Sequence, residues 1–217
     1  MFFSSGHKVI HMPTLRIASA NMDPINTKDY DGLIFTSANA ARFLKLTDGD
    51  KKIKCFCVGN LTERFLRLKG FNNTIAASGT VNALKNIILN SENNAKNLVY
   101  LCGDVVSYDL DKELKQQGYK ISKVINYTST KITDLNKESK DLIKKYPPNI
   151  ALIYSLRSAE CFDEIIRKYS LAELMTHCKV MCISKKIEDF LKSKSWKKTE
   201  VFNPGEELIK IDQIKNG

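Results

Sequence analysis

Small residues, namely hydroxyl, glycine, alanine and amide types, directly follow the apolar runs of this sequence or lie within the next helical turn. Where a buried strand passes into a helix, the first backbone N–H groups of the helix lack intrahelical partners, and the helix dipole favours anions. These residue types in these positions therefore predict contacts to carboxylate or phosphate groups. The residues of this group are Thr36, Ser37, Ala38, Gly59, Asn60, Thr62, Gly103, Ser155 and Ser184.

Structural roles without a ligand are the alternative for the same residues. Ser37 and Ser155 each precede a helical pattern, where a hydroxyl that caps the helix stabilises it by about 1 kcal/mol. Gly59 alternatively permits only a tight turn, and Thr62 alternatively faces solvent from the first helical turn. The residues themselves leave both alternatives open.

The elements that must position these residues alternate along the chain. Short apolar runs such as "LIF" and "LVYLC" are typical of buried parallel strands, and the segments between them carry apolar residues at helical spacing. Strand–helix alternation predicts an α/β fold built from parallel sheets. The candidate strands are Lys8–Met12, Gly32–Thr36, Lys54–Val58, Asn73–Ala76, Leu98–Cys102, Lys120–Asn126, Ile150–Tyr154, Lys179–Ile183 and Thr199–Phe202.

The sequence also repeats itself at offsets of about 112 to 125 residues. "GHKVIHM" resembles "GYKISKV", "LIFTSANAARF" resembles "ALIYSLRSAECF", and "CFCVGNLTERFLRLKGF" resembles "VMCISKKIEDFLKSKSW". These matches pair Ser37 with Ser155 and Gly59 with Ser184, and they predict two similar α/β domains. A strand and a helix precede Gly118 but have no counterpart before Gly6, so we expect the first βα unit of one domain to be missing.

Two polar stretches with turn-forming residues, 19–29 and 126–141, predict connections between the domains. We expect residues 28–128 to form a central domain, and residues 1–20 and 135–217 to form a discontinuous terminal domain. Residues 20–28 and 128–135 would then be the inter-domain hinge. Two crossings of this kind predict a cleft between the domains.

Composition excludes several classes of protein. The formal charge of +10 suits an acidic partner, but the lysines are scattered and no nucleic-acid-binding motif is present. No apolar run approaches the ~20 residues that span a bilayer, and the N-terminus lacks the pattern of a signal peptide. The six cysteines lie mostly in apolar runs without the spacing of a zinc site, so we expect buried thiols and no metal.

Four segments, spaced over most of residues 6–210, resemble one known family. "DYDGLIFTSANAARF" is similar to a strand–(F-T-S)–helix signature, and "CVGNLTERFLRLKGF" to a V-G-x-x-T…G-(F/Y) segment. "LVYLCGD" with "DKELKQQGYKISKVINYTST" resembles an L-x-G…L-x-x-x-G-x-x-(V/I)…Y-x-T region, and "IALIYSLRSAECF" a second F-x-S strand end. Together, in this order, they resemble the uroporphyrinogen-III synthase family of tetrapyrrole biosynthesis.

This resemblance implies two parallel-sheet α/β domains of flavodoxin-like, HemD-like fold, joined by a two-stranded hinge, with the active site in the cleft. The implied substrate is hydroxymethylbilane, a linear tetrapyrrole with acetate and propionate side chains. It is cyclised with inversion of ring D to uroporphyrinogen III, a lyase reaction of porphyrin and heme biosynthesis that needs no metal or organic cofactor. We expect a cytoplasmic monomer that binds neither nucleic acid nor membranes.

Tyr127 is the candidate catalytic residue. It matches the tyrosine of the family's Y-x-T segment, which the resemblance implies to be the acid that assists departure of the substrate hydroxyl. A phenol with its ordinary pKa of about 10 is protonated near pH 7 and can donate. The alternative is a hinge tyrosine that packs between the domains.

Two features depart from the family pattern and keep other functions open. The strand ending near Thr-Arg, with its helix, that opens family members is absent, and "CISKKIEDF" lacks the usual glycine and threonine, so that anion binding there would depend on Ser184 and Lys185. One alternative is a catalytically impaired tetrapyrrole-binding protein of the same fold that gives only the uninverted isomer. Another is a basic nucleic-acid-binding protein.

Overall fold

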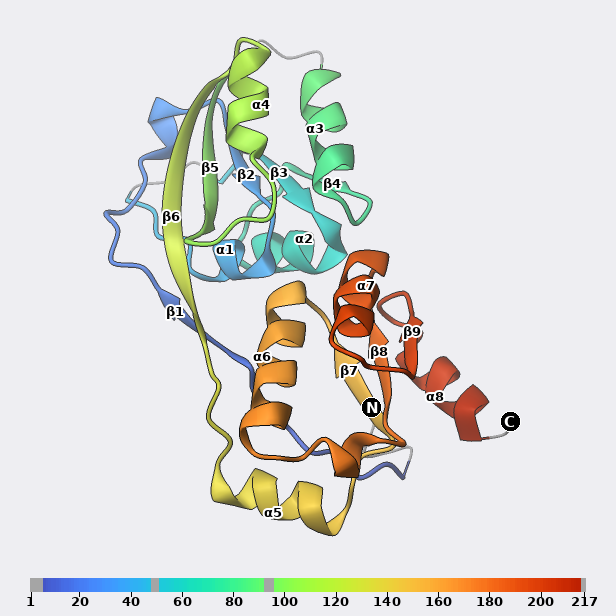
Figure 1. Cartoon of the computed structure of the whole chain (residues 1–217). Coiled ribbons are helices and arrows are strands. Elements are labelled where there is room, and N and C mark those ends of the chain that lie inside the picture. The colour runs from blue at the N-terminus through green and yellow to red at the C-terminus, as the bar shows by residue number, and fades with distance from the viewer. Residues whose placement is uncertain (1–5, 48–50, 92–95, 216–217) are drawn as a thin grey trace. The chain divides into compact units, whose positions relative to one another are not determined.

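The computed structural model describes residues 6–47, 51–91 and 96–215 (Figure 1). The chain divides into two units: unit 1 comprises residues 1–16 and 130–217, and unit 2 comprises residues 17–129. The elements of unit 2 are β2 (Gly32–Phe35), α1 (Ala38–Arg42), β3 (Lys54–Val58), α2 (Gly59–Leu68), β4 (Thr74–Ala77), α3 (Val81–Leu89), β5 (Asn97–Gly103) and α4 (Leu110–Gln116). The elements of unit 1 are α5 (Lys137–Lys145), β7 (Ile150–Ile153), α6 (Leu156–Lys168), β8 (Lys179–Cys182), α7 (Lys185–Ser193), β9 (Thr199–Val201) and α8 (Glu207–Lys215).

Unit 2 is a three-layer α/β structure. Its sheet has the strand order β1-β6-β5-β2-β3-β4, where β1 is Leu15–Ser19 and β6 is Lys120–Lys131, and the pairs from β6 to β4 are all parallel. Leu33 and Phe35 pack with α1 and α2 on one face, while Ile34 packs with α3 and α4 on the other. Because both faces are covered, β2 is apolar throughout after Gly32 and completely buried.

Unit 1 has a smaller parallel sheet of order β7-β8-β9. Val180 and Cys182 face a core that includes residues of α5, α6 and α7, whereas Met181 faces Phe202 and Ile211 of α8. The mixed α/β class with mainly parallel strands, expected from the alternation of patterns, is therefore confirmed.

The strand expected at Lys8–Met12 is wrong: these residues form no strand. Ile10 and Met12 still pack against the core of unit 1, which accounts for their apolar character. A strand also needs a neighbouring backbone to complete its ladder, and no described strand pairs with this segment.

Both connections between the units run as strands, β1 and β6, which are neighbours in the sheet. Within unit 2 the amide of Ala20 donates to the carbonyl of Asn126 at 3.1 Å, and within unit 1 the amide of Ile132 donates to the carbonyl of Thr14 at 2.9 Å. The polar segment after Asn126 therefore continues β6 up to Lys131 instead of ending the strand.

One contact pattern occurs in both units, at positions that the internal repeat pairs. In unit 2, Glu63 of α2 accepts hydrogen bonds from Arg67 at 2.8 Å and from the hydroxyl of Thr74, the first residue of β4, at 2.9 Å. In unit 1, Glu188 of α7 forms an ion pair with Lys192 at 2.9 Å and accepts from the hydroxyl of Thr199, the first residue of β9, at 3.1 Å. Each glutamate ties its helix to the strand that follows it.

Among the described residues, every helix is too short or too polar to cross a membrane. All six cysteines are unpaired and buried, as expected from their apolar surroundings. Burial raises the pKa of the Cys55 and Cys178 thiols to about 12.

Candidate functional site

The C-terminal ends of the parallel strands of unit 2 meet at one edge of its sheet, which we call the carboxyl edge. Thr36 follows β2, Gly59 follows β3 and Gly103 ends β5. Tyr127 lies beside Gly103 on the neighbouring strand β6. In open α/β sheets this edge is where ligands bind, so four of the residues predicted from the sequence share the appropriate side of one sheet.

Tyr127 lies within β6, not after the end of a strand. Its half-buried ring covers Gly103 so closely that a Cβ atom built on Gly103 would lie 2.7 Å from Cε2 and Cζ and 2.9 Å from Oη. The ring of Phe43 stacks on Tyr127, with centroids 6.5 Å apart and planes inclined by 28°. Gly103 is therefore needed as a seat for the phenol, a packing role that the sequence did not reveal.

A β-bulge determines where Tyr127 points. Cys102 pairs with Ile125 but the next residue of β5, Gly103, pairs with Tyr127, so Asn126 is an extra residue on β6. A bulge of this kind locally changes the alternation of side chains between the faces of a sheet. It brings Tyr127 over the one residue of β5 that has no side chain.

Asn126 itself was not among the predicted site residues. Its side chain is completely buried, and its Nδ2 donates to the carbonyl of Ala40 in α1 at 2.7 Å. The only signal in the sequence is an amide in the apolar part of a predicted strand, which is too common to identify a functional position.

Thr36 and Ser37 have separate hydrogen-bond partners. The hydroxyl of Thr36 lies 3.0 Å from the phenol oxygen of Tyr100, and burial raises the pKa of Tyr100 to about 12. Ser37 caps α1 by accepting the amide of Asn39 at 3.2 Å, and Ala38 begins the helix. Capping by Ser37 is thus confirmed, and Tyr100 is a buried hydroxyl at this edge that sequence reasoning missed.

The corner between β3 and α2 differs because no side chain caps it. Gly59 has φ +77°, a backbone conformation that residues with a Cβ atom rarely adopt. The N-cap residue Val58 makes no side-chain hydrogen bond to the helix. Asn60 is exposed, whereas Thr62 is only 3% exposed. The alternative that Thr62 faces solvent is therefore wrong; its short side chain instead lies on the buried side of the helix.

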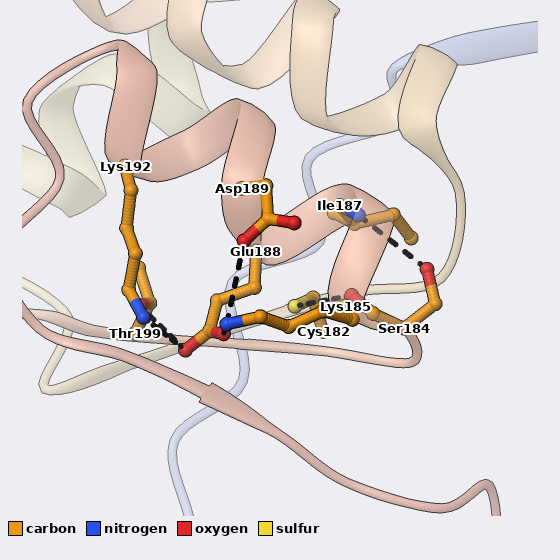
Figure 2. Close-up of polar contacts among 8 residues, drawn as sticks. All are labelled: Cys182, Ser184, Lys185, Ile187, Glu188, Asp189, Lys192 and Thr199. Carbon is orange, nitrogen blue, oxygen red and sulfur yellow. Dashed lines mark hydrogen bonds and ion pairs between the residues drawn. The ribbon is translucent and has the colours of Figure 1, made fainter.

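The two predicted residues of unit 1 are both helix caps. Ser155 accepts the amide of Ser158 at 3.1 Å, and their hydroxyls lie 2.8 Å apart. Ser184 accepts the amide of Ile187 at 3.4 Å (Figure 2). They follow β7 and β8 of the unit 1 sheet, as the corresponding serines and glycines do in unit 2.

Lys185 does not present a free charge beside Ser184. Its ammonium group lies 2.6 Å from Glu188 and 3.3 Å from Asp189 (Figure 2). The ion pairs with Lys185 and Lys192 hold the pKa of Glu188 at about 2. Since the lysine charge is already compensated within α7, Ser184 and the backbone are the groups left for an anion at this corner.

Within the described ranges, no group of three or more histidine, cysteine, aspartate or glutamate side chains is placed to hold a metal ion. The candidate residues are instead phenols, hydroxyls and backbone amides. This is a set of hydrogen-bond donors, which suits a ligand rich in carboxylates.

Comparisons with known proteins agree with this arrangement. The family model described as uroporphyrinogen-III synthase HemD matches residues 2–203. A uroporphyrinogen-III synthetase structure from Helicobacter pylori is similar at TM-score 0.66 and 15% identity, over 94% of this chain and 91% of that one. A mutant uroporphyrinogen III synthase from the extremely thermophilic bacterium Thermus thermophilus is similar at TM-score 0.55 and 14% identity, over 94% and 88%. No curated protein sequence matches the chain significantly.

Proposed function

Because this chain belongs to the uroporphyrinogen-III synthase HemD family, we propose that Tyr127 is the acid of its reaction and that the strand-to-helix corners bind the substrate carboxylates. The reaction of the family is the cyclisation of hydroxymethylbilane with inversion of ring D to uroporphyrinogen III, in heme biosynthesis. Closure without an enzyme gives the uninverted isomer. The protein must therefore hold a flexible polyanion in one reactive shape.

The observation that carries the proposal for Tyr127 is the packing of its ring over Gly103 at the carboxyl edge. The ring lies over Gly103 and stacks on Phe43, so the phenol is held while part of the side chain remains accessible. The phenol O–H donates its proton to the substrate hydroxyl as the C–O bond breaks, and water leaves. The phenolate recovers a proton when the attacking ring loses one at closure, so the group is regenerated.

Backbone amides are the proposed partners of the acetate and propionate groups. The corner at Gly59 and Asn60 supports this best, because α2 has ten residues and its first turn is not capped by a side chain; Thr62 is buried at the end of the same turn. Thr36, Ser37, Ala38 and Gly103 are the proposed contacts along the same edge, and Ser155 and Ser184 those of unit 1. The net charge of +10 adds a long-range attraction for a polycarboxylate.

Cofactor independence is part of the proposal. Loss of water followed by carbon–carbon bond formation involves no net oxidation or reduction, and the acid that it needs is a phenol. Dialysis against a chelator should leave the rate of cyclisation unchanged. That the protein works as a monomer is a further prediction, which size-exclusion chromatography with light scattering tests.

The proposal is tested with hydroxymethylbilane as substrate and with separation of the two product isomers. We expect the parent protein to give the inverted isomer, and Tyr127→Phe to lower kcat by about 100-fold or more, as for the loss of a general acid. Tyr119→Phe is the matched control, because its phenol donates to the carbonyl of Ile88 at 3.0 Å in the same unit but not at this edge.

Two outcomes would contradict the proposal. If Tyr127→Phe turned over as fast as the parent protein, Tyr127 would have no part in the chemistry. If the parent protein gave only the uninverted isomer, the chain would bind tetrapyrrole without controlling its closure.

A further inference from the structure

Asn126 is a buried polar residue that the proposed reaction does not use. Its side chain is fully buried, and Oδ1 has no hydrogen-bond partner among the described residues. The orientation of the amide is determined by its other end, because an oxygen in place of Nδ2 would lie 2.7 Å from the carbonyl oxygen of Ala40. A buried carbonyl without a partner opposes folding, so packing alone would favour an apolar residue here.

The bond from Asn126 to Ala40 fixes the base of the phenol site. It joins the extra residue of the β6 bulge to α1, across 86 residues of chain. Tyr127 directly follows Asn126, and Phe43 lies one helical turn after Ala40, so the bond joins the two segments that carry the stacked rings. This one hydrogen bond therefore links the backbone of α1, which precedes Phe43, to the segment of β6 that carries Tyr127.

We propose that Asn126 is a positioning residue that holds the phenol of Tyr127 in its reactive place by tying the β6 bulge to α1. This inference rests on the proposed role of Tyr127 as the acid. Asn126 touches no substrate atom; it acts by keeping the bulge open and the Phe43 ring against Tyr127. Loss of the tie lets the phenol shift, and misplacement of a reacting group by about 1 Å costs up to ~100-fold in rate.

The test is a double-mutant cycle on kcat with hydroxymethylbilane. Asn126→Leu keeps the approximate size of the side chain and removes both the hydrogen bond and the unpartnered Oδ1. In exchange the buried Ala40 carbonyl loses this donor, so the two effects on the unfolding midpoint in urea should largely offset each other. We expect kcat to fall by about tenfold in the parent protein, and by less than about twofold in the Tyr127→Phe background. KM should change less than kcat, because the carboxylate contacts remain.

Asn97→Leu is the matched control. The Nδ2 of Asn97 donates to the carbonyl of Asp29, also at 2.7 Å, and its Oδ1 likewise has no partner among the described residues, but it lies at the opposite end of β5. Its substitution removes the same kind of bond from the same sheet. We expect parent values of kcat in both backgrounds.

Asn126→Asp supplies a second readout, the pH dependence of activity, which a loss of folding stability alone would not produce. The protonated carboxyl can donate to Ala40 and the ionised one cannot, so activity relative to the parent protein should rise as the pH falls. Equal loss of kcat from Asn126→Leu in both Tyr127 backgrounds, or no loss in either, would overturn the positioning role while Tyr127 keeps its own. If Tyr127→Phe alone had no effect, both proposals would fall together.

Discussion

Replacing Gly103 with alanine tests the seat of the phenol with a single methyl group. The φ angle of Gly103 lies outside the left-handed region, so the backbone accepts a Cβ without strain. The methyl group would lie 2.7 Å from Cε2 and Cζ of Tyr127 and 2.9 Å from Oη. Since carbon atoms pack at about 3.5–4.0 Å, the ring must move by roughly 1 Å.

The stacked ring of Phe43 restricts where Tyr127 can go. We expect Gly103→Ala to lower the free energy of unfolding by about 1–3 kcal/mol, the usual cost of overpacking. We also expect kcat to fall by up to ~100-fold, because the displaced phenol no longer meets the leaving hydroxyl. Tyr127→Ala creates space for the methyl group. The double variant Gly103→Ala/Tyr127→Ala should therefore be as stable as Tyr127→Ala alone.

The measurements are kcat with hydroxymethylbilane and urea unfolding on the same samples. Gly32→Ala is the control, because its Cβ would meet Leu98 Cδ2 at 3.0 Å and the Lys54 carbonyl oxygen at 3.1 Å, at the other end of the same sheet. It should lower stability and leave kcat unchanged. A Gly103→Ala protein with parent stability and parent kcat would refute the reasoning.

Three further predictions concern stability and reactivity. The pKa of Glu188 is held at about 2 in the folded protein, against ~4.3 in the unfolded chain, so its contribution to stability is complete above the unfolded pKa and is lost as the pH falls toward the folded one. The urea midpoint should therefore fall below about pH 5, and Glu188→Gln should make this fall shallower. An unchanged fall in the variant would contradict the prediction. Near pH 8 iodoacetamide should label Cys55 and Cys178 only after denaturation, because burial raises their pKa to about 12; rapid labelling of the native protein would count against this. Ser195→Gly should raise stability by about 0.5–1 kcal/mol by relieving φ +71°, and a lower melting temperature would disprove it.

Strands whose two faces are both covered could be predicted well from the sequence. The range Lys54–Val58 agrees residue by residue, because a continuous apolar run has few other stable locations. Lys8–Met12 has a similar pattern and forms no strand, since pairing depends on a neighbour that periodicity does not reveal. The segment after Asn126 was missed as a strand because its polar residues resemble a loop.

Helices with little apolar content were also missed. In α5, polar and charged residues surround Leu142 and Ile143, so the segment was assigned largely to a polar connection. The segment "SANAARFLKL" (residues 37–46) has apolar residues at helical spacing to its end, yet α1 ends at Arg42 and Leu46 forms a bridge with Ile25. A tertiary contact therefore decides where this helix ends.

The candidate site divides in the same way. Corners that follow apolar runs were predictable, because their position depends only on the order of strand and helix. The contacts of Tyr127 with Gly103 and Phe43 were not, because they depend on one bulge and on residues distant in the sequence.

The recurring glutamate contacts give this chain an internal replicate. Within a single polypeptide, Glu63 and Glu188 each accept a hydrogen bond from a threonine of the following strand and pair with a basic residue one turn further along their own helix. Glutamine substitution of each glutamate in turn, followed by urea unfolding, measures the loss of stability in two different surroundings under one solvent condition. The difference between the two losses of stability measures how much the surroundings decide the strength of such a contact. Those surroundings include Lys185, which pairs with Glu188 where the repeat places Asn60 beside Glu63.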